Sequence, residues 1–178
     1  MNVILETPRL VLRRLTMDDI PGLSLVLSDP ESMLYYPHPF SYDEVIHWVQ
    51  RNLDRYQVDG FGLWAVIRKE DNQFLGDCGI TLQYIDGEIL PEIGFHIIKD
   101  YCNNGYATEA AEACKRFSIE QLKFKSIYSY SETRNKPSQR VAEKIGMKLV
   151  KTFVDNGIEE VVFVYNACDN LFCNTASR

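Results

Sequence analysis

A short polar turn at residues 101–110, Tyr-Cys-Asn-Asn-Gly-Tyr-Ala-Thr-Glu-Ala, constrains this chain more than any other feature. It follows an apolar stretch at residues 93–98 and leads into a long helical pattern. The first four N–H groups of a helix have no partner inside the helix, and together with the helix dipole they attract an anion. Gly105 lets the main chain approach a ligand closely because it carries no Cβ. We therefore expect the amides of residues 103–108 to hold a pyrophosphate, with an ordinary strand-to-helix connection as the alternative.

The length and net charge of the chain limit the class of protein to which it can belong. Its 178 residues suffice for one domain, 1–178, with a core at about 6–166 and a frayed tail at 167–178. The net charge of −6 and the lack of a Lys/Arg cluster indicate no nucleic-acid partner. Neither G-x-x-x-x-G-K-[ST] nor G-x-G-x-x-G near a first strand is present. An acidic chain of this kind must bind an anion through local dipoles.

The cysteines and the apolar runs indicate a location. The five cysteines are scattered without C-x-x-C spacing, at Cys78, Cys102, Cys114, Cys168 and Cys173. This usage is typical of a reduced, cytoplasmic protein, and we expect no metal site. The first residues lack a basic segment and a long apolar core, so we expect no signal peptide. No apolar run approaches the roughly 20 residues of a membrane span, so we expect no membrane partner.

The order of strand and helix patterns predicts a mixed α/β fold. Alternating or continuous apolar runs predict seven strands, at residues 7–15, 61–67, 74–82, 89–98, 126–131, 147–153 and 159–165. Apolar residues at helical spacing, with caps before them, predict four helices at 16–27, 41–56, 105–122 and 137–146. The pairs Asp86-Gly87 and Asn156-Gly157 are typical of tight hairpins. The prediction is one central, mostly antiparallel sheet of about seven strands flanked by about four helices.

Four segments, placed in this order, resemble the GNAT superfamily of acetyl-CoA-dependent N-acyltransferases. They are Glu-Thr-Pro-Arg-Leu-x-Leu-Arg at 6–13, Glu-Ile-Gly-Phe at 92–95, Asn-Gly-Tyr-Ala-Thr-Glu-Ala at 104–110 and Asn-x-x-Ser-x-x-Val-x-Glu-Lys-x-Gly at 135–146. The closer resemblance is to the branch of ribosomal-protein N-terminal acetyltransferases (RimJ/RimL-like). It implies acetyl-CoA as co-substrate and a splay between the fourth and fifth strands, which pantetheine fills as a pseudo-strand.

The resemblance also implies a set of donor-binding residues. The main chain of Phe95, His96 and Ile97 would pair with pantetheine, and Asn135 and Ser138 would lie beside it. The pyrophosphate would lie on the amides of Asn103, Asn104, Gly105, Tyr106, Ala107 and Thr108. The loop departs from the family pattern at Cys102, where an Arg or Gln is usual, so it offers dipoles but no cationic side chain. We interpret Cys102 as a small buried residue.

Acetyl transfer to an amine requires a group that takes the acceptor proton, and Glu92 is the first candidate. Strand alternation puts it on one face with Gly94 and His96, and it matches a family position whose carboxylate often serves as base. A structural carboxylate is the alternative. The side chain of His96 is another candidate proton relay, whereas His38 and His47 have ordinary surface interpretations.

A second group is needed to protonate the departing thiolate. Many family members carry a tyrosine seven residues after the asparagine, but Ala142 stands at that position here. The resembling branch suggests Ser138 instead, one turn into the helix. Its alternative is a first-turn serine satisfied by the backbone, and Tyr130 is a further candidate donor.

The acceptor remains open between several interpretations. Tyr35 and Tyr36 in a proline-punctuated loop, together with Glu92, are predicted to face it. The acceptor is a protein N-terminus, or a small amine such as a polyamine, an amino acid or an aminoglycoside. A CoA-binding module without catalysis is the interpretation from another class, and either a monomer or a homodimer is compatible with the sequence.

Overall fold

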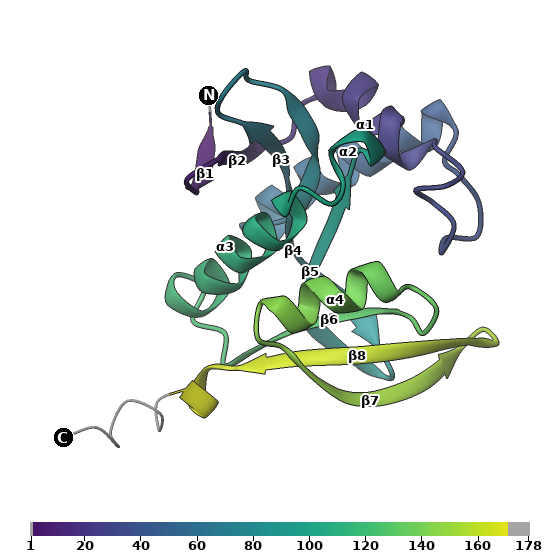
Figure 1. The fold of residues 1–178 in the computed structure, drawn as a ribbon, viewed down its shortest axis with the longest axis vertical. Coiled ribbons are helices and arrows are strands. Elements are labelled where there is room, and N and C mark those ends of the chain that lie inside the picture. Colours follow the sequence, from purple (N-terminus) through teal and green to yellow (C-terminus); the bar gives the residue numbers. More distant parts are fainter. Residues whose placement is uncertain (1, 171–178) are drawn as a thin grey trace.

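The computed structural model describes residues 2–170, and in this part of the chain eight strands form one sheet (Figure 1). Their order across the sheet is β1-β2-β3-β4-β5-β6-β8-β7. Neighbouring strands are antiparallel except β5 and β6, which are parallel. The predicted fold class is therefore confirmed, with one strand more than expected.

The elements follow the predicted order closely. The strands are β1 Val3–Glu6, β2 Leu10–Arg14, β3 Leu63–Arg68, β4 Phe74–Ile85, β5 Glu88–Ile97, β6 Ser126–Glu132, β7 Lys148–Asp155 and β8 Ile158–Asn166. The α-helices are α1 Ile20–Leu27, α2 Tyr42–Val58, α3 Tyr106–Glu120 and α4 Lys136–Lys144. Short 3₁₀ turns lie at Met17–Asp19, Lys99–Tyr101 and Ala167–Asn170. The last of these covers the start of the predicted tail, and residues 171–178 lie outside the described part.

The extra strand arises at the beginning of the chain. The predicted strand 7–15 is shorter, because a turn closed by the Thr7 N–H and the Leu10 carbonyl at 2.9 Å precedes β2. This turn reverses the chain and pairs residues 3–6 with β2. A four-residue strand has too short a pattern to be recognised from sequence alternation.

Local signals in the sequence formed the expected turns and caps. The Glu44 N–H donates to Ser41 Oγ at 3.3 Å, and the Ser41 N–H donates back to Glu44 Oε2 at 2.7 Å, which is the predicted capping box. In the closing hairpin Asn156 and Gly157 have φ values of 48° and 83°, as a two-residue turn requires.

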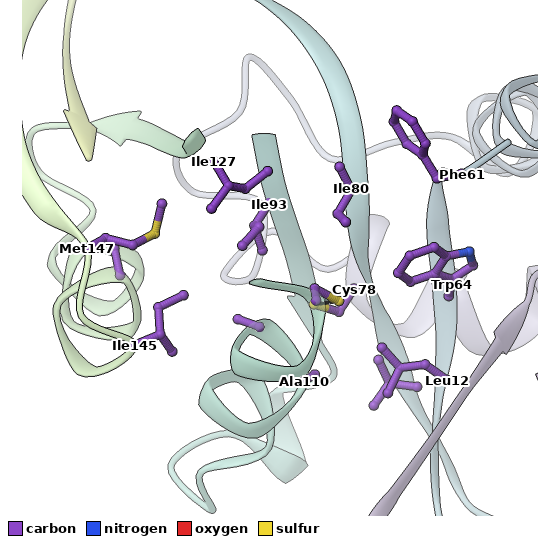
Figure 2. Close-up of a cluster of buried hydrophobic side chains, with 14 of the residues drawn as sticks. Leu12, Phe61, Trp64, Cys78, Ile80, Ile93, Ala110, Ile127, Ile145 and Met147 are labelled. Carbon is purple, nitrogen blue, oxygen red and sulfur yellow. Dashed lines mark hydrogen bonds between the residues drawn. The ribbon is translucent and has the colours of Figure 1, made fainter. Parts of the chain in front are cut away.

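The sheet is buried on both faces by separate groups of helices. Along β3, Trp64 and Val66 pack into the core beneath α3, whereas Ala65 and Ile67 pack into the core beneath α1 and α2. All four are at most 8% exposed. Figure 2 shows the larger core, in which Ala110 of α3 faces Cys78 of β4. A central strand buried on both faces explains the continuous apolar run of β3.

The sheet opens between β5 and β6. β5 pairs with β4 at ten positions, but with β6 at a single one, Glu92 opposite Tyr128. Residues 93–97 of β5 continue beyond this point without a partner strand on that side. Figure 1 shows β6, β7 and β8 running across the direction of β5. This is the predicted splay, between the fifth and sixth strands in the numbering that includes β1.

Residues 2–170 contain neither a membrane-spanning helix nor a cluster of metal ligands. No helix there is long and apolar enough to cross a bilayer. No group of three or more His, Cys, Asp or Glu side chains there is placed to hold a metal ion.

Candidate active site

The start of α3 presents open main-chain donors, as the sequence predicts. Gly105 is the residue before the helix, with φ 81° and ψ 3°, and Asn103 has φ 63°. The first helical hydrogen bond runs from the Glu109 N–H to the Gly105 carbonyl at 3.0 Å. The amides of Tyr106, Ala107 and Thr108 therefore precede the helical ladder, and residues 103–105 are exposed. This geometry suits an anion.

Residues at the beginning of the chain hold this loop in place. Arg9 Nε donates to Glu109 Oε2 at 2.6 Å, and the Arg9 N–H donates to Oε1 at 3.0 Å. Arg9 also donates to the Asn104 carbonyl at 3.0 Å, and Thr7 Oγ1 donates to Glu109 at 2.6 Å. Burial by itself would raise the pKa of Glu109, but these hydrogen bonds outweigh it and lower the pKa. The carboxylate nearest the anion site is thereby neutralised by Arg9.

A groove of about 450 Å³ opens beside this helix start, between α3 and the end of α4. It is lined by Gly105, Thr108, Glu109, Glu112, Lys144 and Ile145. Glu112 pairs with Lys115 at 2.7 Å, which leaves Lys144 as a cation on the opposite wall. The loop itself has no cationic side chain, as the sequence indicates, but the fold supplies one from α4.

The opened side of β5 leaves particular main-chain groups unpaired. The Ile98 N–H donates to the Leu75 carbonyl at 2.8 Å, so alternate residues of β5, including His96, direct their main-chain groups at β4. A Cβ added to Gly76 of β4 would lie 1.9 Å from the His96 carbonyl oxygen, which confirms this direction. The groups of Phe95 and Ile97 consequently point toward the splay. The geometry therefore corrects the expectation for His96: its side chain, not its main chain, is available to the site.

Glu92 lies at the point where the two strands separate. It is 8% exposed, and Thr81 Oγ1 donates to its Oε2 at 3.3 Å. Burial raises its pKa to about 7, against the opposing effects of His96, Thr81 and Arg55. Its carboxylate lies 3.3 Å from the place of a Cβ on Gly94, so both share one face as predicted. A carboxyl group with this pKa can accept a proton near neutral pH.

Tyr36 reaches the same face from the loop before α2. Its hydroxyl lies 2.6 Å from His96 Nε2, and His96 Nδ1 lies 2.7 Å from Asp77 Oδ1. Trp48 Nε1 of α2 donates to the second oxygen of Asp77 at 2.9 Å. Tyr36 is 38% exposed, but its hydroxyl is at the inward end of the ring. The two tyrosines predicted to act together therefore have different surroundings. Tyr36 contacts His96, whereas Tyr35 is half-buried and within electrostatic range of Arg134.

The first turn of α4 places the other predicted groups. Asn135 Oδ1 accepts from the Ser138 N–H at 3.2 Å and so caps the helix. The Ser138 hydroxyl is half-buried and has no hydrogen-bond partner among residues 2–170. Ala142 is 3% exposed in the core, and its methyl group has no proton to donate. Burial raises the pKa of Tyr130 on β6 to about 12, which leaves it a proton donor.

Several other residues differ from the expectations or were missed. Cys102 was expected to be buried, but as a residue it is exposed. Its sulfur atom is partly buried, and this burial raises the pKa of the thiol. His38, by contrast, lies on the surface as expected, where it pairs with Glu44 at 2.8 Å. Sequence reasoning missed Asp77, whose only signal is a lone carboxylate in an apolar strand. It also missed Glu160 of β8, whose Oε2 is buried without a hydrogen-bond partner among the described residues.

Glu160 lies within electrostatic range of two tyrosines near the splay, Tyr36 and Tyr130. Burial, with Glu132 and Asp155 nearby, raises its pKa to about 7. It acts electrostatically on both Tyr36 and Tyr130, and Glu92 does the same. Carboxylates from β5 and β8 therefore approach these phenols from both sides of the splay.

An open helix start, a splay and a buried carboxyl group together define an acyltransferase that uses a nucleotide thioester. Residues 9–148 match the family described as the Acetyltransferase (GNAT) domain. The protein YkkB of Bacillus subtilis, described as uncharacterized, is 38% identical over 149 residues, which cover 83% of this chain and 87% of YkkB. The chain belongs to the GNAT family of acetyltransferases, and the predicted family and enzyme class are confirmed.

Solved structures agree with this assignment. An acetyltransferase from Agrobacterium tumefaciens superposes with a TM-score of 0.80 at 27% identity, covering 91% of this chain and 93% of that one. RimL, a ribosomal L7/L12 α-N-protein acetyltransferase in complex with coenzyme A, superposes with a TM-score of 0.75 at 17% identity, covering 93% and 98%. The likeness to RimL concerns the fold.

Proposed function

We propose that this protein transfers the acetyl group of acetyl-CoA to a primary amine by direct attack in a ternary complex, and that the amine is an α-amino group. The observation that carries the proposal is the succession of the open α3 amides, the unpaired residues 93–97 of β5 and the buried carboxyl group of Glu92. Its donor end suits a diphosphate, its middle suits an extended pantetheine arm, and its far end holds a carboxyl group near pKa 7.

The donor is held by main-chain groups. The amides of residues 103–108 take the pyrophosphate, and Lys144 on the wall of the groove adds a positive charge. The main chain of Phe95 and Ile97 pairs with pantetheine, and Asn135 lies beside the splay at the start of α4. The thioester carbonyl then lies close to Glu92.

The chemistry begins with the acceptor, which is an ammonium ion in solution. Glu92 takes one proton, and the resulting amine attacks the thioester carbonyl. A C–N bond forms, the C–S bond breaks, and the electron pair leaves on sulfur. Ser138 gives its proton to the thiolate and regains one from solvent. N–H groups of β5 around Ile97 stabilise the oxyanion.

Electrostatics and proton affinity support an amine acceptor, and an α-amino group in particular. Glu92 and Glu160, with Tyr36 and Tyr130, make the acceptor side acidic and phenolic, which attracts a cation. An α-amino group has a pKa of about 7.7–8.0, against about 10.4 for lysine. A base near pKa 7 deprotonates the former much more readily. RimL, which shares the fold, is named for an acceptor of this kind.

Release of free thiol from acetyl-CoA tests the proposal. N-terminal peptides, their N-blocked lysine-containing counterparts and small amines are compared at equal concentration. The proposal requires the highest kcat/KM on unblocked peptides. A preference for polyamines, free amino acids or aminoglycosides would replace the acceptor class, and CoA binding without turnover on any amine would indicate a binding module.

A further inference from the structure

Four side chains from separate elements form one continuous hydrogen-bonded chain. Trp48 donates to Asp77 at 2.9 Å, Asp77 contacts His96 at 2.7 Å, and His96 contacts the Tyr36 hydroxyl at 2.6 Å. They come from α2, β4, β5 and the loop before α2. Asp77 is fully buried, and the side chain of His96 is 10% exposed. The chain thus runs from the interior to the acceptor side of the site.

The partners determine the direction of each hydrogen bond. Asp77 uses both oxygens as acceptors, one from Trp48 and one from His96, so His96 carries a proton on Nδ1. In the neutral imidazole Nε2 is then an acceptor, and the Tyr36 hydroxyl donates to it. The lone pairs of the Tyr36 oxygen remain free to accept a hydrogen bond from a ligand.

The stoichiometry of acetyl transfer leaves a task for such a chain. An ammonium ion carries three N–H bonds and the product amide carries one, so two protons leave the nitrogen. Glu92 takes the first before attack. The second becomes acidic when the C–N bond forms, at a moment when Glu92 is already protonated. A second proton acceptor on the same side of the site is therefore needed.

We propose that Asp77, His96 and Tyr36 form this second acceptor, a proton relay in which the Tyr36 oxygen contacts the acceptor nitrogen. As the C–N bond forms, a proton passes from nitrogen to the Tyr36 oxygen while the Tyr36 proton passes to His96 Nε2. The resulting imidazolium is stabilised by the Asp77 carboxylate. Tyr36 is then a catalytic residue, and Asp77 is a positioning residue that acts through His96. This inference rests on the proposed function.

Groups around the relay set the pH range in which it can work. His96 faces Asp77 of β4, Glu92 of β5, Trp48 of α2 and Tyr36, and Arg55 of α2 lies near Glu92. Burial lowers the pKa of His96, but Asp77 and Glu92 outweigh it and raise the pKa above its ordinary value. Burial, then Glu92, Asp77, Tyr130 and Glu160, raise the pKa of Tyr36, so the phenol stays protonated. Below the pKa of His96, Nε2 is occupied and the relay is blocked.

The test compares wild type with Tyr36→Phe, Asp77→Asn and the control Tyr84→Phe, whose side chain is at the exposed tip of the β4–β5 hairpin. We expect Tyr36→Phe to lower kcat about 10²-fold with the KM for acetyl-CoA retained. This decrease in the kcat of Tyr36→Phe should be smaller with a weakly basic amine as the acceptor, because its nitrogen gives up the second proton readily. Asp77→Asn should lower kcat and shift the acidic limb of its pH profile to lower pH. Tyr84→Phe should match wild type.

A second readout does not depend on turnover. Nitrogen NMR of the histidine side chains should show His96 protonated on Nδ1 in its neutral form, with a pKa that falls in Asp77→Asn. A proton on Nε2 instead would overturn the relay, even if the Asp77 variant fails to fold. If the wild type is active and Tyr36→Phe has the same kcat, the relay is wrong and the proposed function stands. Absence of turnover in the wild type would overturn the proposed function and the relay with it.

Discussion

Arg9 and Glu109 are one hundred residues apart in the chain and are joined at 2.6 Å between Nε and Oε2. Arg9 immediately precedes β2, the second strand from the β1 edge of the sheet, and Glu109 is in the first turn of α3. The pair ties the start of the sheet to the helix end that we assign to the pyrophosphate. It also removes the repulsion that a free carboxylate would exert on an anion there.

Replacing Arg9 should therefore weaken donor binding. Arg9→Ala frees the Glu109 carboxylate and the loop carbonyl of Asn104, so we expect the Kd for CoA to rise about tenfold, or about 1.4 kcal/mol. Calorimetric titration measures it. Arg116→Ala, in the exposed part of α3, is the matched control and should bind CoA as wild type does. Equal Kd values for the two variants would contradict this role of Arg9.

Replacing Gly105 with alanine has two expected effects, backbone strain and a clash with the ligand, and a control variant distinguishes them. Gly105 has φ 81°, so Gly105→Ala should destabilise the fold by about 1 kcal/mol and also block the approach of a phosphate. Gly87→Ala, at φ 89° in a hairpin with open space around it, is the control with the same strain. Thermal unfolding should report similar losses for both variants. Only Gly105→Ala should lose CoA affinity, and intact affinity would remove the pyrophosphate from this loop.

Glu92 should control the pH dependence of both activity and stability. The folded pKa of about 7 lies above the ordinary value of 4.5, so the folded state prefers the protonated form. The contribution of this group to the free energy of unfolding is fully present below pH 4.5. It is lost as the pH rises to about 7, and the loss amounts to about 3 kcal/mol at most. Activity should rise over the same limb, because only the carboxylate accepts a proton.

Glu92→Gln tests both expectations. It should lower kcat/KM by about 10²- to 10³-fold and flatten the dependence of unfolding free energy on pH. Glu88→Gln, exposed on the same strand, should leave both profiles unchanged. A flattened stability profile with full activity would leave Glu92 as a structural carboxyl group.

Ser138 should act in leaving-group departure and not in donor binding. Ser138→Ala retains the main-chain N–H that Asn135 accepts, so the helix cap persists. We expect kcat to fall about tenfold or more with the Kd for acetyl-CoA retained. Ser126→Ala, at the far end of β6, is the control. Unchanged turnover would exclude Ser138 as the acid, and would leave Tyr130 as the next candidate.

The turns, caps and individual helices could be predicted because their causes are local. Ser41 and Glu44 are three residues apart and cap α2 through their own main chain. Gly105 takes a positive φ that few other residues tolerate, and the helix behind it follows from apolar spacing. β1 was missed because its four residues pair only after Thr7 turns the chain, which is a consequence of sheet formation.

The sequence by itself determined most of the order of the elements, the family and the open start of α3 at Gly105, since all of these rest on spacing and backbone preference within short segments. Only the tertiary structure decided which side chains meet. It brought Lys144 to the groove beside Gly105, and it joined Asp77, His96 and Tyr36 from three separate elements. A hydrogen bond depends on the distance and angle between two groups, and packing of the whole sheet and its helices sets these for two residues that are 60 positions apart in the chain.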